Sequence, residues 1–380
     1  MTLPALCLPL FKADGEVDWR SGELLADGVY IGMPEEVYFA QRRLGSTDLK
    51  DLFKTPVNWW RRSAFNPHFK GKKWVYGNDR DYGRAFHYLL LEGEAEYKAR
   101  CEVCPFEGFT GGDARKWRDQ RHLDRITILS EEMDRNIRYM VALVQNHPQL
   151  RDALGEGLSE LTVFWTDEQG RRFRARFDKL LPSFVLDPKS FGGHTRGSDD
   201  QDRALRIIAE LSYDVQRYLY DMARERMIDF ILSGEVYGGT EAQRAWLGRF
   251  PEADAARLAE RMEFYANGHP DQQSAWSWSW LFLQKPDDSK GHGAILLPIE
   301  RPRFDLTWRT GKLKVERGLE NYDHFVRRFG LGDTPNEDGE VAVPWASINP
   351  MWRPRDDEFP PWLGDVNAVM AAEEEEGEDQ

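Results

Sequence analysis

Residues 184–189 read Phe-Val-Leu-Asp-Pro-Lys, an apolar run that ends in the pattern Asp187-x-Lys189. A short apolar run bounded by turn residues is typical of a buried β-strand. Side chains at positions i and i+2 of a strand leave on the same face, so an acid and an amine can converge on one point. The pattern alone is weak, because Asp48-Leu49-Lys50 has it too, in a predicted helix where i and i+2 diverge.

The neighbouring sequence gives Asp187 its context. Residues 161–165, 171–180 and 184–187 are aromatic or β-branched runs with turn signals at 167–170 and 182–183, which predicts a three-stranded antiparallel meander. A two-residue hairpin at 182–183 sets Asp178 opposite Asp187. A three-residue loop at 168–170, with Gly170 left-handed, sets Glu160 opposite Asp178. One register thereby gathers the predicted catalytic residues Glu160, Asp178, Asp187 and Lys189.

The segments on either side of the meander alternate between helical and strand patterns. Ser46 is the predicted N-cap of a helix over 46–54, a second helix covers 82–92 up to Gly93, and a third runs from Ser130 to 147. Beyond a loop at 191–200 we expect one long helix (201–232), an inserted helical pair (235–272), strands at 276–284 and 293–300, and a helix at 311–329.

This order of elements predicts an α/β or α+β sandwich, in which a mixed central sheet with an antiparallel meander is flanked by helices. We divide the chain into an N-terminal lead-in (1–45), one main domain (46–330) with a helical insert at 235–272, a C-terminal extension (331–365), and a tail (366–380). The run of acids from Glu373 to Asp379 predicts that the tail is disordered.

Carboxylates gathered on one strand face repel each other unless a cation lies between them, and oxygen ligands favour Mg²⁺ or Mn²⁺. The meander therefore predicts a divalent metal site. The alternative is a solvated strand face whose acids form salt bridges with Arg174 and Arg176.

Charge distribution indicates the kind of partner better than the net charge of −14 does. Residues 50–73 hold seven basic side chains against Asp51 alone, a local charge of +6, together with Trp59 and Trp60. A basic segment that also carries aromatic rings is typical of a DNA-facing surface. The chain shows no leader peptide and no membrane-spanning apolar run, so we expect it in the cytoplasm.

Four segments, in order, resemble the phage and prophage RecE-type (exonuclease VIII-like) exodeoxyribonucleases of the PD-(D/E)XK superfamily. The segments contain the runs Gly83-Arg-Ala-Phe-His87, Arg176-Phe-Asp178-Lys, Leu186-Asp187-Pro-Lys189 and Tyr213-Asp-Val-Gln216-Arg-Tyr-Leu-Tyr220. The likeness extends from about residue 28 to 330, because residues 28–60 resemble the family's lead-in. The resemblance implies a restriction-endonuclease-like core.

The resemblance also implies roles for individual residues. His87, Asp178 and Asp187 would be side-chain metal ligands, the carbonyl of Pro188 a further ligand, and Lys189 the catalytic lysine. Gln216 and Tyr220 fall on the family's Gln-x-x-x-Tyr motif, and with Tyr213 they form a helical stripe that braces the site, contacts DNA, or simply packs against the sheet. His194 is a rival ligand to His87.

The sequence departs from the family pattern at Pro188, where an aliphatic residue is usual, at Ser190, where Thr is common, and in its long 235–272 insert. A proline here suggests an edge strand or a strand end.

The expected function is Mg²⁺- or Mn²⁺-dependent hydrolysis of linear double-stranded DNA from its ends. By the same resemblance we expect a ring-shaped homo-oligomer, a single-strand annealing partner in phage-type recombination, and a location in the host cytoplasm if the chain is phage-encoded. The alternative is a protein of the same fold that binds DNA ends with little catalysis. An iron–sulfur nuclease is excluded, because the chain has only Cys7, Cys101 and Cys104.

Overall fold

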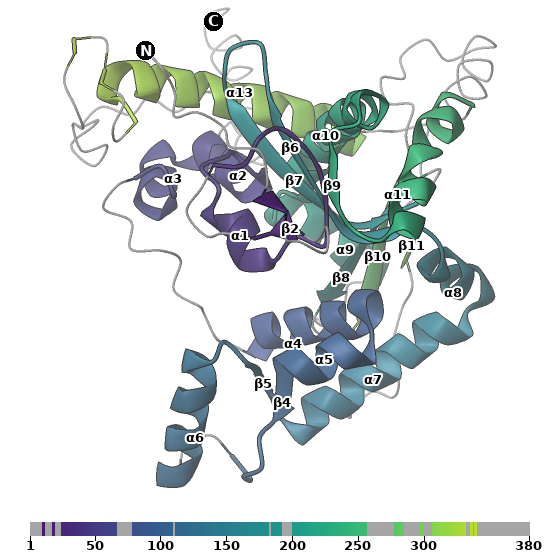
Figure 1. Ribbon diagram of the computed structural model, residues 1–380. Coiled ribbons are helices and arrows are strands. Elements are labelled where there is room, and N and C mark those ends of the chain that lie inside the picture. Colours follow the sequence, from purple (N-terminus) through teal and green to yellow (C-terminus); the bar gives the residue numbers. More distant parts are fainter. Residues whose placement is uncertain are drawn as a thin grey trace, which may run out of the picture.

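The structure is a computed structural model that describes residues 10–11, 17–19, 24–66, 78–108, 111–181, 184–191, 200–256, 277–284, 297–298, 306–331, 335–336 and 338–339. A central seven-stranded sheet has the order β11-β10-β8-β7-β6-β3-β9 and contains both parallel and antiparallel neighbours. Helices lie on both faces of this sheet (Figure 1). The expected mixed α/β architecture is confirmed.

The predicted meander forms the middle of the sheet. Its strands are β6 (Leu158–Thr166), β7 (Arg172–Leu180) and β8 (Phe184–Phe191), each antiparallel to the next. The predicted strand at 276–284 is β10 (Ser277–Gln284), which runs parallel to β8 along its whole length. Of the strand predicted at 293–300, the described part is β11 (Leu297–Pro298), antiparallel to β10.

The end of the sheet beyond β6 is built from segments that the sequence analysis predicts to lie outside the core. β3 (Gly28–Ile31) comes from the predicted lead-in and pairs with β6. β9 (Val236–Gly238) begins the predicted insert and forms the edge beside β3, so the prediction of a purely helical insert is wrong. A strand this short carries no recognisable sequence pattern and depends on pairing with β3. The insert then continues as α11 (Glu241–Gly248) and a helical stretch over 250–256.

Two helical layers enclose the sheet (Figure 1). On one face, α2 (Ser46–Lys54), α3 (Pro56–Arg62), α10 (Tyr213–Ser233) and α13 (Leu306–Phe329) bury an aromatic-rich core. On the other face lie α4 (Asn78–His87), the π-helix η1 (Tyr88–Glu92), α5 (Glu94–Arg100), α7 (Glu131–Asn146) and α8 (Pro148–Gly155). β8 contributes to both cores, since Val185 faces the first and Leu186 the second.

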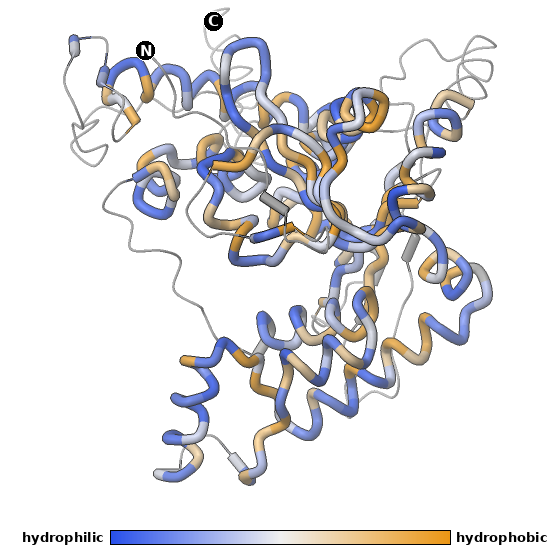
Figure 2. Tube along the Cα trace, viewed as in Figure 1, coloured by the Kyte–Doolittle hydropathy of each residue, from blue (hydrophilic) through white to orange (hydrophobic). Residues whose placement is uncertain are grey.

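Smaller elements complete the described chain. They are β1 (Leu10–Phe11), β2 (Val17–Asp18), α1 (Glu35–Ala40), β4 (Cys101–Val103), α6 (Gly112–Leu123), β5 (Thr127–Leu129) and α9 (Asp200–Glu210). α6 projects from the β4–β5 pair, away from the central sheet, and is mostly hydrophilic (Figures 1 and 2). Within the described ranges, every helix is too short or too polar to cross a membrane.

Local signals predicted some helix boundaries and missed others. The Ser130 side chain accepts a hydrogen bond from the Met133 amide (3.1 Å), as expected of the N-cap of α7. α2 has the predicted bounds, but its N-cap is Gly45 rather than Ser46. The Gly45 amide donates to Asp48 Oδ2 (2.8 Å), so Asp48 satisfies the start of this helix.

The long helix predicted for 201–232 is in fact two helices, and that prediction is wrong. α9 ends at Glu210, and Ser212 adopts a left-handed conformation (φ 50°) immediately before α10. An apolar pattern that continues across the break conceals it, although Leu205 (56 % exposed) and Leu211 (52 % exposed) do not join the core. The break makes Tyr213 the first residue of α10.

The predicted helix at 82–92 also changes character partway. α4 ends at His87, and the next five residues form the π-helix η1, which stops at Gly93 as expected. Single π-helical turns occur often at functional sites. In this chain the turn begins directly after a proposed metal ligand.

The predicted strand register is confirmed. Gly170 is left-handed (φ 78°) in the β6–β7 loop, and the pairs Ser159↔Lys179 and Leu161↔Phe177 place Glu160 opposite Asp178. Pro182 and Ser183 lie outside the described residues, but Lys179↔Leu186 and Leu180↔Val185 set Asp178 opposite Asp187.

The proposed DNA-facing segment needs a correction. Trp59 (1 % exposed) and Trp60 (6 % exposed) belong to the core, so neither ring is available to stack on bases. The indole N–H of Trp59 donates to Asp48 Oδ1 (3.0 Å). Lys54, Arg61 and Arg62 are exposed, whereas the lysines at 70, 72 and 73, like the acidic tail, lie outside the described residues.

Candidate functional site

The site lies where strands β7 and β8 separate. Their described pairing consists of Lys179↔Leu186 and Leu180↔Val185, and it stops at the level of Asp178 and Asp187. Beyond this point β8 continues to pair with β10 on its other side. The resulting fork leaves two carboxylates side by side in the interior, since Asp187 is fully buried and the Asp178 side chain is 14 % exposed.

Lys189 lies between these two carboxylates, as the Asp-x-Lys pattern predicts. Its Nζ is 2.6 Å from Asp187 Oδ1 and 3.8 Å from Asp178 Oδ2. Burial disfavours the ammonium, but the two aspartates outweigh burial and raise the pKa of Lys189 above its ordinary value. Burial also raises the pKa of Asp178 and of Asp187, and in Asp187 the neighbouring carboxylate adds to this effect.

His87 reaches the fork from the end of α4. Its Nε2 is 3.1 Å from the carbonyl oxygen of Pro188, and its Nδ1 is 4.0 Å from Asp178 Oδ2. Burial, followed by the charge of Lys189, lowers the pKa of His87 to about 4. The imidazole is therefore neutral at pH 7 and retains a lone pair for a metal.

Pro188 sits within a central strand, but beyond the point where the described pairing of β8 with β7 stops, so the expected edge is a local one. β8 has β7 on one side and β10 on the other. The N–H and C=O of one strand residue point to the same side, and the Pro188 carbonyl points toward His87 rather than β10. The missing N–H therefore falls where pairing with β7 has ended, and no ladder bond is lost.

Glu160 completes the cluster from β6. Glu160, His87 and Asp178 each offer one ligand atom within 4.8 Å of the others. Glu160 has a left-handed backbone (φ 53°) inside a strand, which is a strained conformation of the kind that concentrates at functional sites. Burial, with Glu92 and Glu35 as like charges, raises the pKa of Glu160 to about 7, even though Arg176 opposes the shift.

The arginines do not neutralise the two aspartates. Arg174 instead forms an ion pair with Asp48 (3.1 Å), and Arg176 approaches Glu160 at 3.8 Å. In the described part of the chain, Asp178 and Asp187 have Lys189 as their only Lys or Arg partner within 4.0 Å. The alternative of an arginine-bridged strand face therefore holds for Glu160, which pairs with Arg176, and does not hold for Asp178 and Asp187.

The α10 stripe divides into two parts. Gln216 is buried and its Nε2 donates to Asp187 Oδ1 (3.4 Å), while the Lys189 ammonium lies 5.0 Å from the Tyr213 ring centroid. Tyr220 packs edge-on against Phe177 (5.3 Å between centroids) and Trp278 (5.4 Å). Gln216 and Tyr213 thus contact the charged cluster, and Tyr220 serves the seam between helix and sheet.

The donor set suits a hard divalent cation. Asp178 Oδ2 and Asp187 Oδ2 are both buried and, among the described residues, accept no hydrogen bond from the backbone or a basic side chain, although the two carboxyl groups lie within hydrogen-bonding reach of each other. Unsatisfied buried carboxylate oxygens are costly unless a cation binds them. With the neutral His87 ring, Glu160 and the Pro188 carbonyl, they make an oxygen-rich set of the kind that Mg²⁺ and Mn²⁺ accept. His194, the rival ligand, lies outside the described residues.

The structure adds one residue that sequence reasoning set aside. Lys50, which served as the helical counterexample, extends from α2 so that its Nζ lies 5.0 Å from the Tyr213 ring centroid, as does that of Lys189. No sequence signal links residues 50 and 189, because α2 reaches the site only through tertiary packing. The strained backbone of Glu160 and the π-helical turn after His87 likewise have no local sequence signal.

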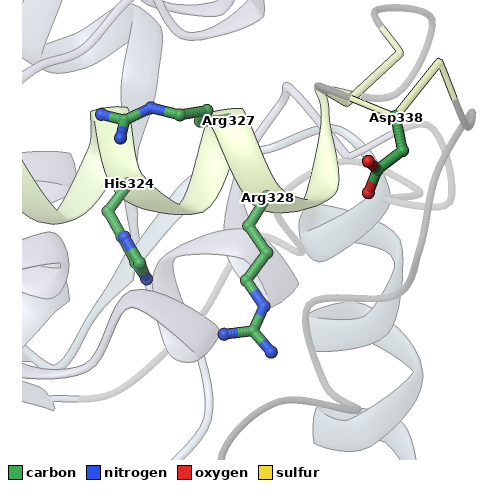
Figure 3. A pocket seen from close by; sticks show the side chains of 4 residues that line it. All are labelled: His324, Arg327, Arg328 and Asp338. Carbon is green, nitrogen blue, oxygen red and sulfur yellow. The ribbon is translucent and has the colours of Figure 1, made fainter.

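A surface pocket of about 300 Å³ lies beside the last turns of α13. It is lined by His324, Arg327 and Arg328 of α13 and by Asp338, and Figure 3 shows the two arginines extending in different directions. It has a single carboxylate and no buried acid pair, so it offers no comparable metal chemistry.

Comparison with models of known protein families and with curated proteins found no match for this chain.

Proposed function

We propose that this chain is a metal-dependent deoxyribonuclease with a restriction-endonuclease-like core. The observation that carries the proposal is the strand fork, where two buried aspartates with unsatisfied oxygens flank Lys189 beside a neutral histidine. Structural ion pairs seldom leave carboxylate oxygens unsatisfied in the interior, whereas hydrolytic metal sites require such oxygens.

His87, Glu160 and Asp178, whose ligand atoms lie within 4.8 Å of one another, would hold the cation, and Asp187 and the Pro188 carbonyl would complete its coordination. When bound, Mg²⁺ or Mn²⁺ would neutralise charge on the phosphate and lower the pKa of a bound water. Gln216 fixes the orientation of Asp187 through its hydrogen bond, and the neighbouring core fixes β8 on both faces.

Lys189 supplies the positive charge of the site. Its ammonium is held between the two aspartates, within reach of any phosphate oxygen that approaches them. During hydrolysis a bond forms between the water oxygen and phosphorus and the bond to the leaving sugar oxygen breaks, while the attacking water gives a proton to solvent and the leaving oxygen takes one from solvent. Lys189 can orient the water and stabilise the charge that develops on the phosphate oxygens.

The resemblance to RecE-type enzymes supports a more specific proposal. The substrate is then the end of a linear duplex, the protein acts as a ring-shaped oligomer in the host cytoplasm, and the single strand that it produces passes to an annealing protein. The exposed basic residues Lys54 and Arg61 lie on α2 and α3, on the layer that delivers Lys50 to the site.

Digestion of end-labelled linear duplex and closed circular DNA, with Mg²⁺ or EDTA, tests the proposal. We expect Mg²⁺-dependent loss of the linear substrate alone, and no loss with the Lys189→Ala variant. Cleavage of the circular DNA would support the nuclease proposal but show that the enzyme does not require DNA ends. If the DNA stays intact in both Mg²⁺ and Mn²⁺ while the protein still binds it, the nuclease proposal is overturned. The alternative, a protein that binds DNA ends without cleaving them, is then favoured.

A further inference from the structure

A second lysine reaches the cluster from a different layer of the fold. Lys50, in the second turn of α2, and Lys189, on β8, each place an ammonium 5.0 Å from the centroid of the Tyr213 ring. Ammonium groups at this distance are attracted to an aromatic ring. Tyr213 therefore links two cations that are far apart in the sequence, at the first residue of α10.

The position of Lys50 is fixed by close packing of α2 against α13. A Cβ atom at Gly318 would come within 3.1 Å of the Leu49 carbonyl oxygen, so only glycine lets the two helices approach this closely without a shift. The Asn321 amide donates to the Leu52 carbonyl oxygen (2.9 Å). These contacts hold the turn that carries Lys50 against the core.

Lys50 forms no ion pair with the described residues, although acids are near. Asp187 Oδ1 is occupied by Lys189 at 2.6 Å, and Asp214 Oδ2 by Lys314 at 2.7 Å. Burial, and next the charge of Lys189, lower the pKa of Lys50 to about 8. A half-buried ammonium without a counterion, beside another ammonium, has an unused capacity to bind an anion.

We propose that Lys50 binds a phosphate of the DNA backbone next to the phosphate that is hydrolysed. This inference rests on the proposed function and adds a substrate contact that its motifs do not include. A phosphodiester that approached the two aspartates and Lys189 would meet Lys50 on the side of the site formed by α2. Lys54, one turn further along α2 and exposed, continues the same basic face away from the site.

The first test compares DNA affinity across salt concentrations, with Ca²⁺ replacing Mg²⁺, for wild type, Lys50→Gln and Lys50→Arg. Lys98→Gln is the matched control, because Lys98 is exposed and its ion-pair partner among the described residues is Glu94 on α5 (3.2 Å). We expect Lys50→Gln to bind about 10-fold more weakly and to reduce the salt slope by about 0.9, the value for one lost phosphate contact. Lys50→Arg should retain most of the affinity, and Lys98→Gln all of it.

A second test identifies the phosphate. Duplexes that carry one neutral methylphosphonate, moved stepwise along the strand, should weaken wild-type binding at the contacted position and cause no additional loss in Lys50→Gln. Equal losses in both proteins at every position would overturn the assignment.

Folding and metal binding are measured in parallel, because a purely structural role for Lys50 would alter them. Unchanged melting temperature and Mn²⁺ affinity in Lys50→Gln support a DNA contact, whereas a loss of either that accounts for the weaker DNA binding overturns it. Failure of the proposed function would appear separately, as wild-type protein that does not cleave DNA. Wild-type cleavage with full activity and affinity in Lys50→Gln would refute only the inference about Lys50.

Discussion

The chain contains the pattern Asp-x-Lys in two structural settings, at 48–50 and at 187–189. In strand β8, Asp187 and Lys189 share a face and their charged atoms lie 2.6 Å apart. In helix α2, Asp48 turns toward Gly45, Trp59 and Arg174, while Lys50 points toward Tyr213. The same residue types therefore make one ion pair in the strand and two unrelated side chains in the helix.

The difference shows how backbone geometry assigns a role to a motif. Within the described part of the chain, Asp187 Oδ2 accepts no hydrogen bond from a backbone or basic group, but the oxygens of Asp48 accept from an amide, an indole and a guanidinium. A carboxylate that is fully satisfied stabilises structure, and one that is left unsatisfied is available for chemistry. The predictions below test this distinction, beginning with the largest effect.

Asp187→Asn should abolish DNA cleavage, with a loss of about 10³-fold or more, because it removes a proposed metal ligand and the closest partner of Lys189. Single-turnover cleavage of linear duplex measures the effect. The variant should melt within a few degrees of wild type, because Lys189 keeps Asp178 as a partner and the repulsion between the two buried aspartates is relieved. Cleavage at the wild-type rate would show that Asp187 is structural, like Asp48.

Asp48→Asn should have the opposite effects. It removes the charged partner of Arg174 and weakens the start of α2, so we expect it to lower the free energy of unfolding by about 2–3 kcal/mol. Urea denaturation measures this loss. Activity per folded molecule should remain near that of wild type, and a selective loss of cleavage without destabilisation would contradict the structural role.

Gln216→Ala removes a hydrogen bond to Asp187 without removing any of the proposed metal ligands. Residues that orient metal ligands contribute about 10-fold to metal affinity or activity, so we expect a loss near this size. The loss should appear mainly in the Mg²⁺ concentration needed for half-maximal cleavage. Tyr218→Phe, on the same helix but packed against Trp308 (5.1 Å between ring centroids), is the control and should cleave normally.

Lys179→Met should have the smallest effect, a gain in stability on the order of 1–2 kcal/mol at pH 7. Lys179 is buried beside Ser159 (3.5 Å), and burial lowers its pKa from 10.5 to about 8. The unfolded chain therefore binds this proton more tightly than the folded chain does. The cost to folding is complete below pH 8 and disappears as the pH rises toward 10.5.

Urea denaturation of Lys179→Met and wild type from pH 7 to 10.5 measures this contribution. The advantage of the variant should shrink over that range. An advantage that stays constant with pH would show that Lys179 titrates in the folded chain as it does in water.

The sequence predicted the meander and its register because those features depend on local signals. Strand alternation, Gly170 and the spacing of the turns were sufficient to set Glu160, Asp178 and Asp187 opposite one another. The break at Ser212 was missed because no glycine or proline marks it, and the edge strand β9 was missed because three residues are too few to show strand alternation. Tertiary contacts decide both.

The candidate site, like the fold, was predictable only where local sequence signals or the family resemblance applied. The residues on one hairpin followed from strand geometry, and His87 and Gln216 followed from resemblance and now lie against Pro188 and Asp187. Lys50 was not predictable, because its place beside Tyr213 depends on how α2 packs against α13. A helical register indicates which face a lysine occupies, and it does not indicate what that face meets.

Calorimetric titration with Mn²⁺ of wild type, Asp187→Asn and Asp48→Asn tests the central claim most directly. The claim predicts saturable Mn²⁺ binding to wild type and to Asp48→Asn, and loss of that binding in Asp187→Asn. Absence of binding in wild type, or equal binding in all three proteins, would show that the strand fork is not a metal site.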